Sequence, residues 1–111
     1  MNFEKYKLAQ GSIMIAFSDK NLSVGTLELN SEQELARHNR PCLESLFQLR
    51  GVSVIKFDDE EVVLREGESI DISAGRFHIH SNRSDESSLT FWKASGDITE
   101  IIENIRKGNK I

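Results

Sequence analysis

The chain has 111 residues, of which 38% are hydrophobic and 29% charged, and its 18 acidic and 14 basic residues give a formal net charge of −4. A chain of this length and composition can bury one core without disulfides, so we expect a single globular domain over residues 1–111 rather than a disordered or membrane protein. The scattered acidic charge argues against nucleic acid and anionic lipid as partners.

The cysteine count and the apolar runs restrict the cellular setting. Cys42 is the only cysteine, so no internal disulfide can form, and we expect a reducing compartment, the cytoplasm. The longest early apolar run, residues 13–17, is too short for a membrane span or for the apolar region of a secretory signal. We therefore expect neither in this sequence.

Short segments rich in Val, Ile, Leu and Phe follow one another at roughly ten-residue spacing, which is typical of a β-sandwich or barrel. The predicted strands are residues 12–17, 22–29, 45–49, 52–57, 61–65, 69–73, 76–80 and 88–92. An acidic corner at residues 58–60 predicts a hairpin, because Asp favours turn conformations. Ser31 and Glu34 have the spacing of a helix start and predict one helical turn before Leu35.

The C-terminal residues change from an alternating to a helical period. Four isoleucines fall at i, i+3, i+4 and i+7, on one face of a helix over about residues 98–107: Ile98, Ile101, Ile102 and Ile105. The flanking residues suit its two ends, with Asp97 and Glu100 at the start and Arg106, Lys107 and Gly108 at the finish. The apolar face must cover either the outer face of the sheet or a second subunit.

Two histidines stand two positions apart in RFHIH, residues 76–80. Side chains alternate between the two faces of a strand, so His78 and His80 point the same way while Phe77 and Ile79 point the other way. Such a pair fits the polar face of an edge strand as well as it fits a binding site.

A second polar set lies in residues 38–51. The same alternation puts four residues on one face: His38, Arg40, Cys42 and Glu44. Pro41 can introduce a bulge that shifts this register. Two imidazoles with one carboxylate form the facial ligand set of non-haem Fe(II) oxygenases and suit first-row divalent metals in general. His38, Glu44 and His78 would supply that set.

The two segments together resemble the two sequence motifs of the cupins. The second motif is similar to the spacing of Gly67, Ser73, Gly75, His78 and Asn82, with Ser73 where the family usually has Pro. The first motif is similar to the spacing of His38, Arg40, Glu44 and Gly51, with Arg40 where the second His normally stands and Glu32 where the leading Gly would fall. The resemblance is close over residues 38–82 and loose over the flanking strands.

The resemblance implies an all-β fold, a cupin-like double-stranded β-helix or jelly-roll barrel, over about residues 6–95, followed by the short C-terminal α-helix. It implies sharp bends at Gly51 and Gly67 and positive φ at Gly75. Family members commonly form homodimers. By analogy, the apolar helix or edge strands near residues 12–17 would supply the contact between subunits.

The resemblance also implies that the barrel holds a divalent transition metal (Mn, Fe, Co, Ni or Zn) on His38, Glu44 and His78. A small organic ligand would lie beside it, and Arg40 and His80 are the residues expected to bind that ligand. The family's motifs do not require His80, so an exposed position at the barrel mouth is an equal alternative for it.

Arg40 departs from the family's usual set of three His and one Glu. Its guanidinium stays protonated and cannot ligate a metal. Two unit charges about 4 Å apart interact by roughly 4 kcal/mol at an effective dielectric of about 20, so a divalent ion beside Arg40 meets about twice that repulsion, less what Glu44 cancels.

Three arrangements of Arg40 therefore stay open. In the first, it turns away or grips an anionic ligand while the metal stays on His38, Glu44 and His78, with His80 or water completing the ligand set. In the second, it pairs with Glu44 in a metal-free barrel and binds a carboxylate or phosphate. In the third, the barrel is packed shut and these residues form a structural polar network.

Three functions correspond to these arrangements. In the first reading, the chain is a metal-dependent enzyme that acts on a small organic molecule, with the ion as Lewis acid or O₂ site. Alternatively, it is a module that binds or senses a small, anionic metabolite without turning it over. In the third reading, it is a dimeric assembly protein whose cupin site is vestigial. None of these names a reaction, because a fold does not dictate a function.

Overall fold

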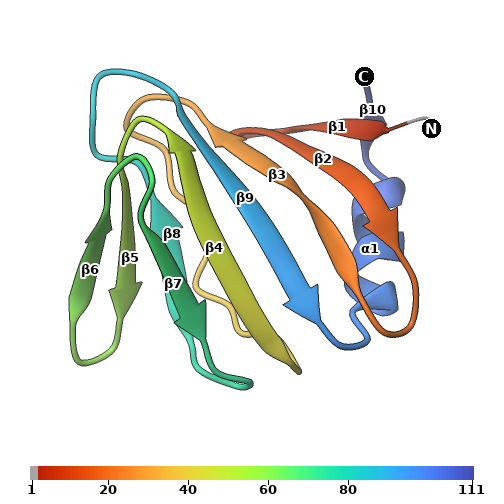
Figure 1. Ribbon diagram of the computed structural model, residues 1–111. Helices are drawn as coiled ribbons and strands as arrows, with labels where there is room; N and C mark the ends of the chain where they lie inside the picture. The colour runs from red at the N-terminus through yellow and green to blue at the C-terminus, as the bar shows by residue number, and fades with distance from the viewer. Residues whose placement is uncertain (1–2) are drawn as a thin grey trace.

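The computed structural model describes residues 3–111, which form ten strands and one helix (Figure 1). In chain order the elements are β1 (Glu4–Leu8), β2 (Gly11–Ser18), β3 (Ser23–Leu29), β4 (Leu43–Arg50), β5 (Ser53–Phe57), β6 (Glu61–Leu64), β7 (Ser69–Ile72), β8 (His78–Ser81), β9 (Ser88–Ser95), α1 (Thr99–Arg106) and β10 (Asn109–Lys110). No helix in this part of the chain is long and apolar enough to cross a membrane.

The strands form two antiparallel sheets. Seven strands lie in the order β10-β1-β2-β3-β9-β4-β7, and three lie in the order β6-β5-β8. Figure 1 shows the small sheet standing beside the β4 and β7 end of the large sheet. This arrangement confirms the expected all-β jelly-roll fold. The hairpin expected at residues 58–60 is also present, with the amide of Phe57 donating to the carbonyl oxygen of Glu60 at 2.8 Å between β5 and β6.

The core lies between the sheets and follows from strict alternation along the strands. In β3 and β9 every second residue is buried, as expected for strands with one face inward. Leu46 and Trp92 of the large sheet and Ile55 and Leu64 of the small sheet belong to one cluster of buried apolar residues. Each such side chain contributes roughly 1.5–3 kcal/mol to folding.

Helix α1 lies beside β2 and β3, at the opposite end of the molecule from β5 and β6 (Figure 1). The carboxylate of Asp97 accepts hydrogen bonds from the amide and hydroxyl of Thr99 at 3.0 and 2.7 Å. The N-cap residue, however, is Ile98, which makes no side-chain cap hydrogen bond, so Asp97, the expected cap, stands one position before it. Ile98 and Ile102 are buried in the core of the same chain. The apolar face therefore packs inside the chain, so the expectation that it covers the outer face of the sheet was wrong. Contact of this helix with a second subunit stays a prediction.

The two chain ends meet at one edge of the large sheet, which the sequence pattern did not predict. Strand β10 pairs with β1, with Tyr6 opposite Lys110. The guanidinium of Arg106, at the end of α1, donates to both carboxylate oxygens of Glu4 at 2.9 and 2.8 Å. Strand β2 therefore lies inside the sheet between β1 and β3, so the expectation of an edge strand near residues 12–17 was wrong.

The segment before β4 also differs from expectation. The helical turn expected before Leu35 is absent, because residues 33–38 run irregularly along β8. Glu34 bridges to Ser81, and the amide of Leu35 donates to the carbonyl oxygen of His80 at 3.0 Å. Strand β4 begins only at Leu43, so a continuous strand from residue 38 was wrong as well.

Positive backbone φ marks the bends that the motifs implied. Gly51, Gly67 and Gly75 have φ of 72°, 84° and 80°. Among residues 3–111, Glu32 is the single non-glycine residue with positive φ, at 64°. It stands where the resemblance places the leading glycine of the first motif, and its side chain is exposed. A left-handed conformation at a residue with a β-carbon costs about 1–2 kcal/mol.

We predict that Glu32→Gly raises the free energy of unfolding by about 1 kcal/mol, because glycine removes this strain. The larger conformational entropy of glycine in the unfolded chain offsets part of the gain. Glu32→Ala removes the same carboxylate but keeps a β-carbon, so it should give no such gain. Urea unfolding of the two variants measures the difference. Equal stabilities would show that the backbone at residue 32 stores no strain.

Candidate metal centre and adjoining cavity

Backbone pairing brings two of the expected ligands together. The amide of His38 donates to the carbonyl oxygen of His78 at 3.0 Å, and the amide of His78 donates back to that of His38 at 2.9 Å. Their rings meet edge to face with centroids 4.4 Å apart. Glu44 reaches them from β4 in the other sheet, and one donor atom from each of the three residues lies within 4.8 Å of the others. The structure thus assembles the expected set of His38, Glu44 and His78.

Hydrogen bonds to the backbone orient both imidazoles. Nδ1 of His38 lies 2.7 Å from the carbonyl oxygen of Ala36, and Nδ1 of His78 lies 3.0 Å from that of Arg76. A carbonyl oxygen can only accept, so Nδ1 carries a proton in each ring and Nε2 is the free nitrogen. Metal-binding histidines are commonly oriented in this way by a backbone carbonyl.

His78 and Glu44 set a nitrogen donor beside a carboxylate. Nε2 of His78 lies 3.5 Å from Oε1 of Glu44, and both residues are buried. A cation held between these two atoms would interact favourably with both. The donor set therefore fits a divalent cation.

The protonation states of the other two residues also suit a metal. Burial, and then the charge of Arg40, lower the pKa of His38 to about 4, so this ring is neutral at pH 7. Burial alone would raise the pKa of Glu44, but its interactions with His78 and Arg40 outweigh burial, and the pKa lies below the ordinary value. A neutral imidazole and an ionised carboxylate are the forms that bind metals.

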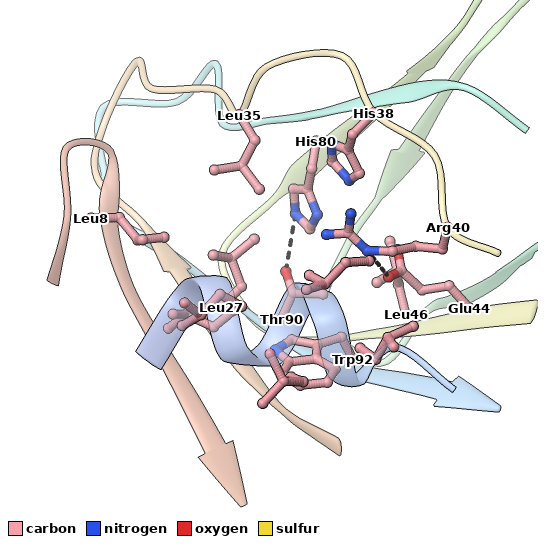
Figure 2. Close-up of a pocket in the computed structure, with 15 residues that line it drawn as sticks. Leu8, Leu27, Leu35, His38, Arg40, Glu44, Leu46, His80, Thr90 and Trp92 are labelled. Atoms are coloured by element: carbon pink, nitrogen blue, oxygen red, sulfur yellow. Dashed lines mark hydrogen bonds and ion pairs between the residues drawn. The ribbon is translucent and has the colours of Figure 1, made fainter. Parts of the chain in front are cut away.

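Arg40 lies at the boundary between this donor set and a cavity. Its Nε is 3.5 Å from Oε2 of Glu44, and Figure 2 shows its guanidinium turned inward, toward His80. The structure combines two of the expected arrangements. Arg40 pairs with Glu44, as in the second, and His38, Glu44 and His78 converge, as in the first. The third arrangement, a barrel packed shut, is wrong, because a cavity of about 190 Å³ opens beside Arg40.

The cavity wall is mostly apolar and comes from both the sheet and the helix. The sheet contributes Leu8, Ile13, Leu27, Leu46 and Trp92, and α1 with the residue before it contributes Ile98, Ile101, Ile102 and Ile105. Leu35 adds a side chain from the segment along β8. The apolar face of α1 thus forms one wall of an internal cavity.

His80 lines the cavity but does not join the three donors. It is buried, which rules out the exposed position considered for it, and burial lowers its pKa to about 4. Its Nε2 lies 3.1 Å from Oγ of Ser53 and 3.4 Å from Oγ1 of Thr90, which donates to Oε1 of Gln48 at 2.8 Å. A role for His80 in ligand binding stays a prediction.

Sequence reasoning missed the polar network around His80, in which Ser53 and Thr90 contact its ring and Gln48 accepts from Thr90. Ser53, Thr90 and Gln48 are polar residues at inward positions of strands, and each is fully buried. The alternation of the predicted strands could have identified Gln48 and Thr90, since each lies two residues from an inward apolar side chain.

The comparisons with known proteins agree with this geometry. A family model described as "Cupin domain" matches residues 24–92. No curated protein matches the chain. Among solved structures, the fold is similar to an RmlC-like cupin from Shewanella frigidimarina, with a TM-score of 0.79 and 13% identity over 90% of this chain and 89% of that one.

Two further structures show the same fold. The cupin domain of Schizosaccharomyces pombe Cnp3 has a TM-score of 0.74 and 13% identity, covering 94% of this chain and 74% of that one. A cupin superfamily protein from Desulfitobacterium hafniense has a TM-score of 0.71 and 14% identity, covering 77% and 76%. At these identities the similarity establishes the fold alone.

We predict that Thr90→Val lowers the free energy of unfolding by about 1–3 kcal/mol, because Gln48 loses its buried donor and His80 loses a polar neighbour. Thr90→Ser keeps the hydroxyl and loses only a methyl group, so its loss should be about 1 kcal/mol or less. Urea unfolding monitored by circular dichroism distinguishes them. A Val variant as stable as the Ser variant would contradict the assigned hydrogen bonds.

Proposed function

The chain belongs to the cupin domain family, and from this premise we propose that its barrel binds a divalent transition metal together with a small organic anion. The observation that carries the proposal is the facing pair of His78 Nε2 and Glu44 Oε1, 3.5 Å apart, with Nδ1 of His78 already committed to a carbonyl oxygen. His38 supports it as a neutral third donor. Nitrogen and oxygen donors of this kind accept Mn, Fe, Co, Ni or Zn.

When bound, the ion would act as a Lewis acid toward an oxygen atom of the ligand. Arg40 supplies a second positive charge at the same end of the cavity, so both charges favour an anion. The guanidinium and the ion repel each other, and a ligand carboxylate between them would relieve that repulsion. In this view Arg40 replaces a metal ligand with a group that binds the organic ligand.

A metal-free binding or sensing module is the second candidate, and the 3.5 Å contact between Arg40 and Glu44 favours it. The cavity and the guanidinium would still bind an anion. The two candidates therefore differ only in whether a metal ion is bound.

We predict that protein purified without a chelating tag contains about one equivalent of divalent metal by elemental analysis, and that His78→Ala reduces it to background because an inward donor is lost. His80→Gln is the matched control, since His80 lies outside the donor set and glutamine keeps a polar group in the wall. It should retain the metal.

Arg40 provides a second arm of the same experiment. Arg40→His removes the repulsion and restores the family's usual fourth ligand, so its metal affinity should exceed that of Arg40→Gln, which removes the charge alone. Metal that persists in His78→Ala would contradict the ligand assignment. Absence of metal from the wild-type protein and from Arg40→His would favour the metal-free module.

We also propose a homodimer formed through the outer face of the large sheet. Leu43, Phe47 and Leu49 alternate along one face of β4 and are exposed by 40%, 41% and 44%. Phe47 pairs with Phe91 of β9 in register on the same face. A row of large apolar side chains on a sheet face is typical of a buried interface.

Light scattering coupled to size exclusion tests this interface. We predict a dimer for the wild-type protein and a monomer for Phe47→Glu, because a carboxylate in an apolar interface is desolvated without a partner. Val63→Glu, at an equally exposed position on β6 of the small sheet, should remain a dimer. A dimeric Phe47→Glu protein would place the contact elsewhere.

A further inference from the structure

We propose that the organic ligand is an apolar monocarboxylic acid, with its carboxylate on Arg40 and a hydrocarbon body about the size of one six-membered ring inside the cavity. This inference rests on the proposed function and narrows it from small anions in general to one chemical class. It follows from the distribution of polar and apolar groups, the free edge of Arg40, the size of the cavity and the charge outside it.

The cavity has one polar end. Figure 2 shows Arg40 and Glu44 on one side, and Leu8 and Leu27 on the other. The remaining wall is dominated by the isoleucines of α1, with His80 and Thr90 already bonded to each other and to their neighbours. A ligand that fills this space must therefore be charged at one end and apolar over most of its length.

Arg40 has donors left for such a ligand. Within residues 3–111 its polar contacts are Nε to Glu44 and Nη1 to the carbonyl oxygen of Asn39, both at 3.5 Å, which is long for a hydrogen bond. The terminal edge of the guanidinium matches the two oxygens of a carboxylate. Glu44 lies on the Nε side, so an anionic group is favoured at the opposite edge.

The size of the cavity limits the body of the ligand. An apolar cavity of ~150 Å³ lined by Leu, Ile and Phe holds one benzene molecule. The present cavity of about 190 Å³ is slightly larger and partly polar at one end. It therefore suits a single ring, or a branched chain of equal volume, joined to a carboxylate through a short link.

The surroundings of the polar end disfavour a second carboxylate. Arg40, Ile98 and Ile101 line both the cavity and an open groove, and the groove is also lined by Asp97 and Glu100. A dianion bound to Arg40 would place its outer charge near these two acidic side chains. The groove thus selects a monocarboxylate over a dicarboxylate.

Calorimetric titration with four probes tests the class, on the protein as purified and after removal of metal with a chelator. Phenylacetate carries the charge and the ring, acetate the charge alone, 2-phenylethanol the ring alone, and succinate a second charge. We expect phenylacetate to bind at least about tenfold more tightly than each of the others. Arg40→Gln should lose about tenfold or more for phenylacetate and leave 2-phenylethanol unchanged.

A second variant tests the position of the ring. Ile105→Phe enlarges a half-buried side chain of the cavity wall and should weaken phenylacetate binding without strengthening acetate binding. Val63→Phe makes a similar enlargement at an exposed position on β6, outside the cavity, and should bind phenylacetate like the wild type. Succinate or acetate binding as tightly as phenylacetate would overturn the apolar class and leave the proposed anion site intact. 2-Phenylethanol binding as tightly would overturn the role of Arg40. If none of the four probes binds, both this inference and the anion part of the proposed function are wrong. The proposed metal site would be unaffected, because elemental analysis tests it separately.

Discussion

Two backbone hydrogen bonds between His38 and His78 determine whether this protein has a polar site at all. They fasten the irregular segment of residues 33–38 to β8, and they are what places the two imidazoles in contact. Glu44 comes from the large sheet, so the three donors also join the two sheets. Loosening the segment would separate the donors even if every strand stayed folded.

Arg40 stands where the first cupin motif usually has a second histidine, and this difference changes the charge of the site. A fourth neutral ligand would complete a metal centre, whereas a guanidinium opposes the metal and attracts an anion. The ion pair with Glu44 holds Arg40 at the polar end without using its terminal donors. His38 and Glu44 of the donor set line the cavity together with Arg40, so the proposed metal and anion would be linked through the charge of Arg40.

Much of the fold was predictable because alternation is a local signal. The hairpin at residues 58–60, the eight predicted strands and the helix near residues 98–107 all follow from periodicity and turn residues. The convergence of His38, Glu44 and His78 was also predicted, although part of the argument for it was wrong. A continuous strand from His38 to Glu44 was expected, whereas His38 belongs to the irregular segment that is bridged to His78 of β8, and Glu44 lies on β4. The spacing of the two motifs identified the three residues correctly, whereas strand alternation placed His38 and Glu44 on one strand.

The remaining features of the fold depend on contacts between residues far apart in the sequence, which a local pattern does not predict. β1 and β10 are short, polar strands, and β10 has only two residues, so neither has a recognisable apolar face. The expected packing of α1 on the outer face of the sheet was wrong, because its row of isoleucines requires an apolar partner but does not identify it. The cavity exists only because α1, β1 to β3 and the segment before β4 converge.

The pairing of β1 with β10 and the contact of Arg106 with Glu4 mean that the last turn of α1 is stapled to the beginning of the chain. One wall of the cavity is therefore held in place by contacts with β1. A modification that separates residues 109–110 from β1 would act on the isoleucines of α1 as well as on the edge of the sheet.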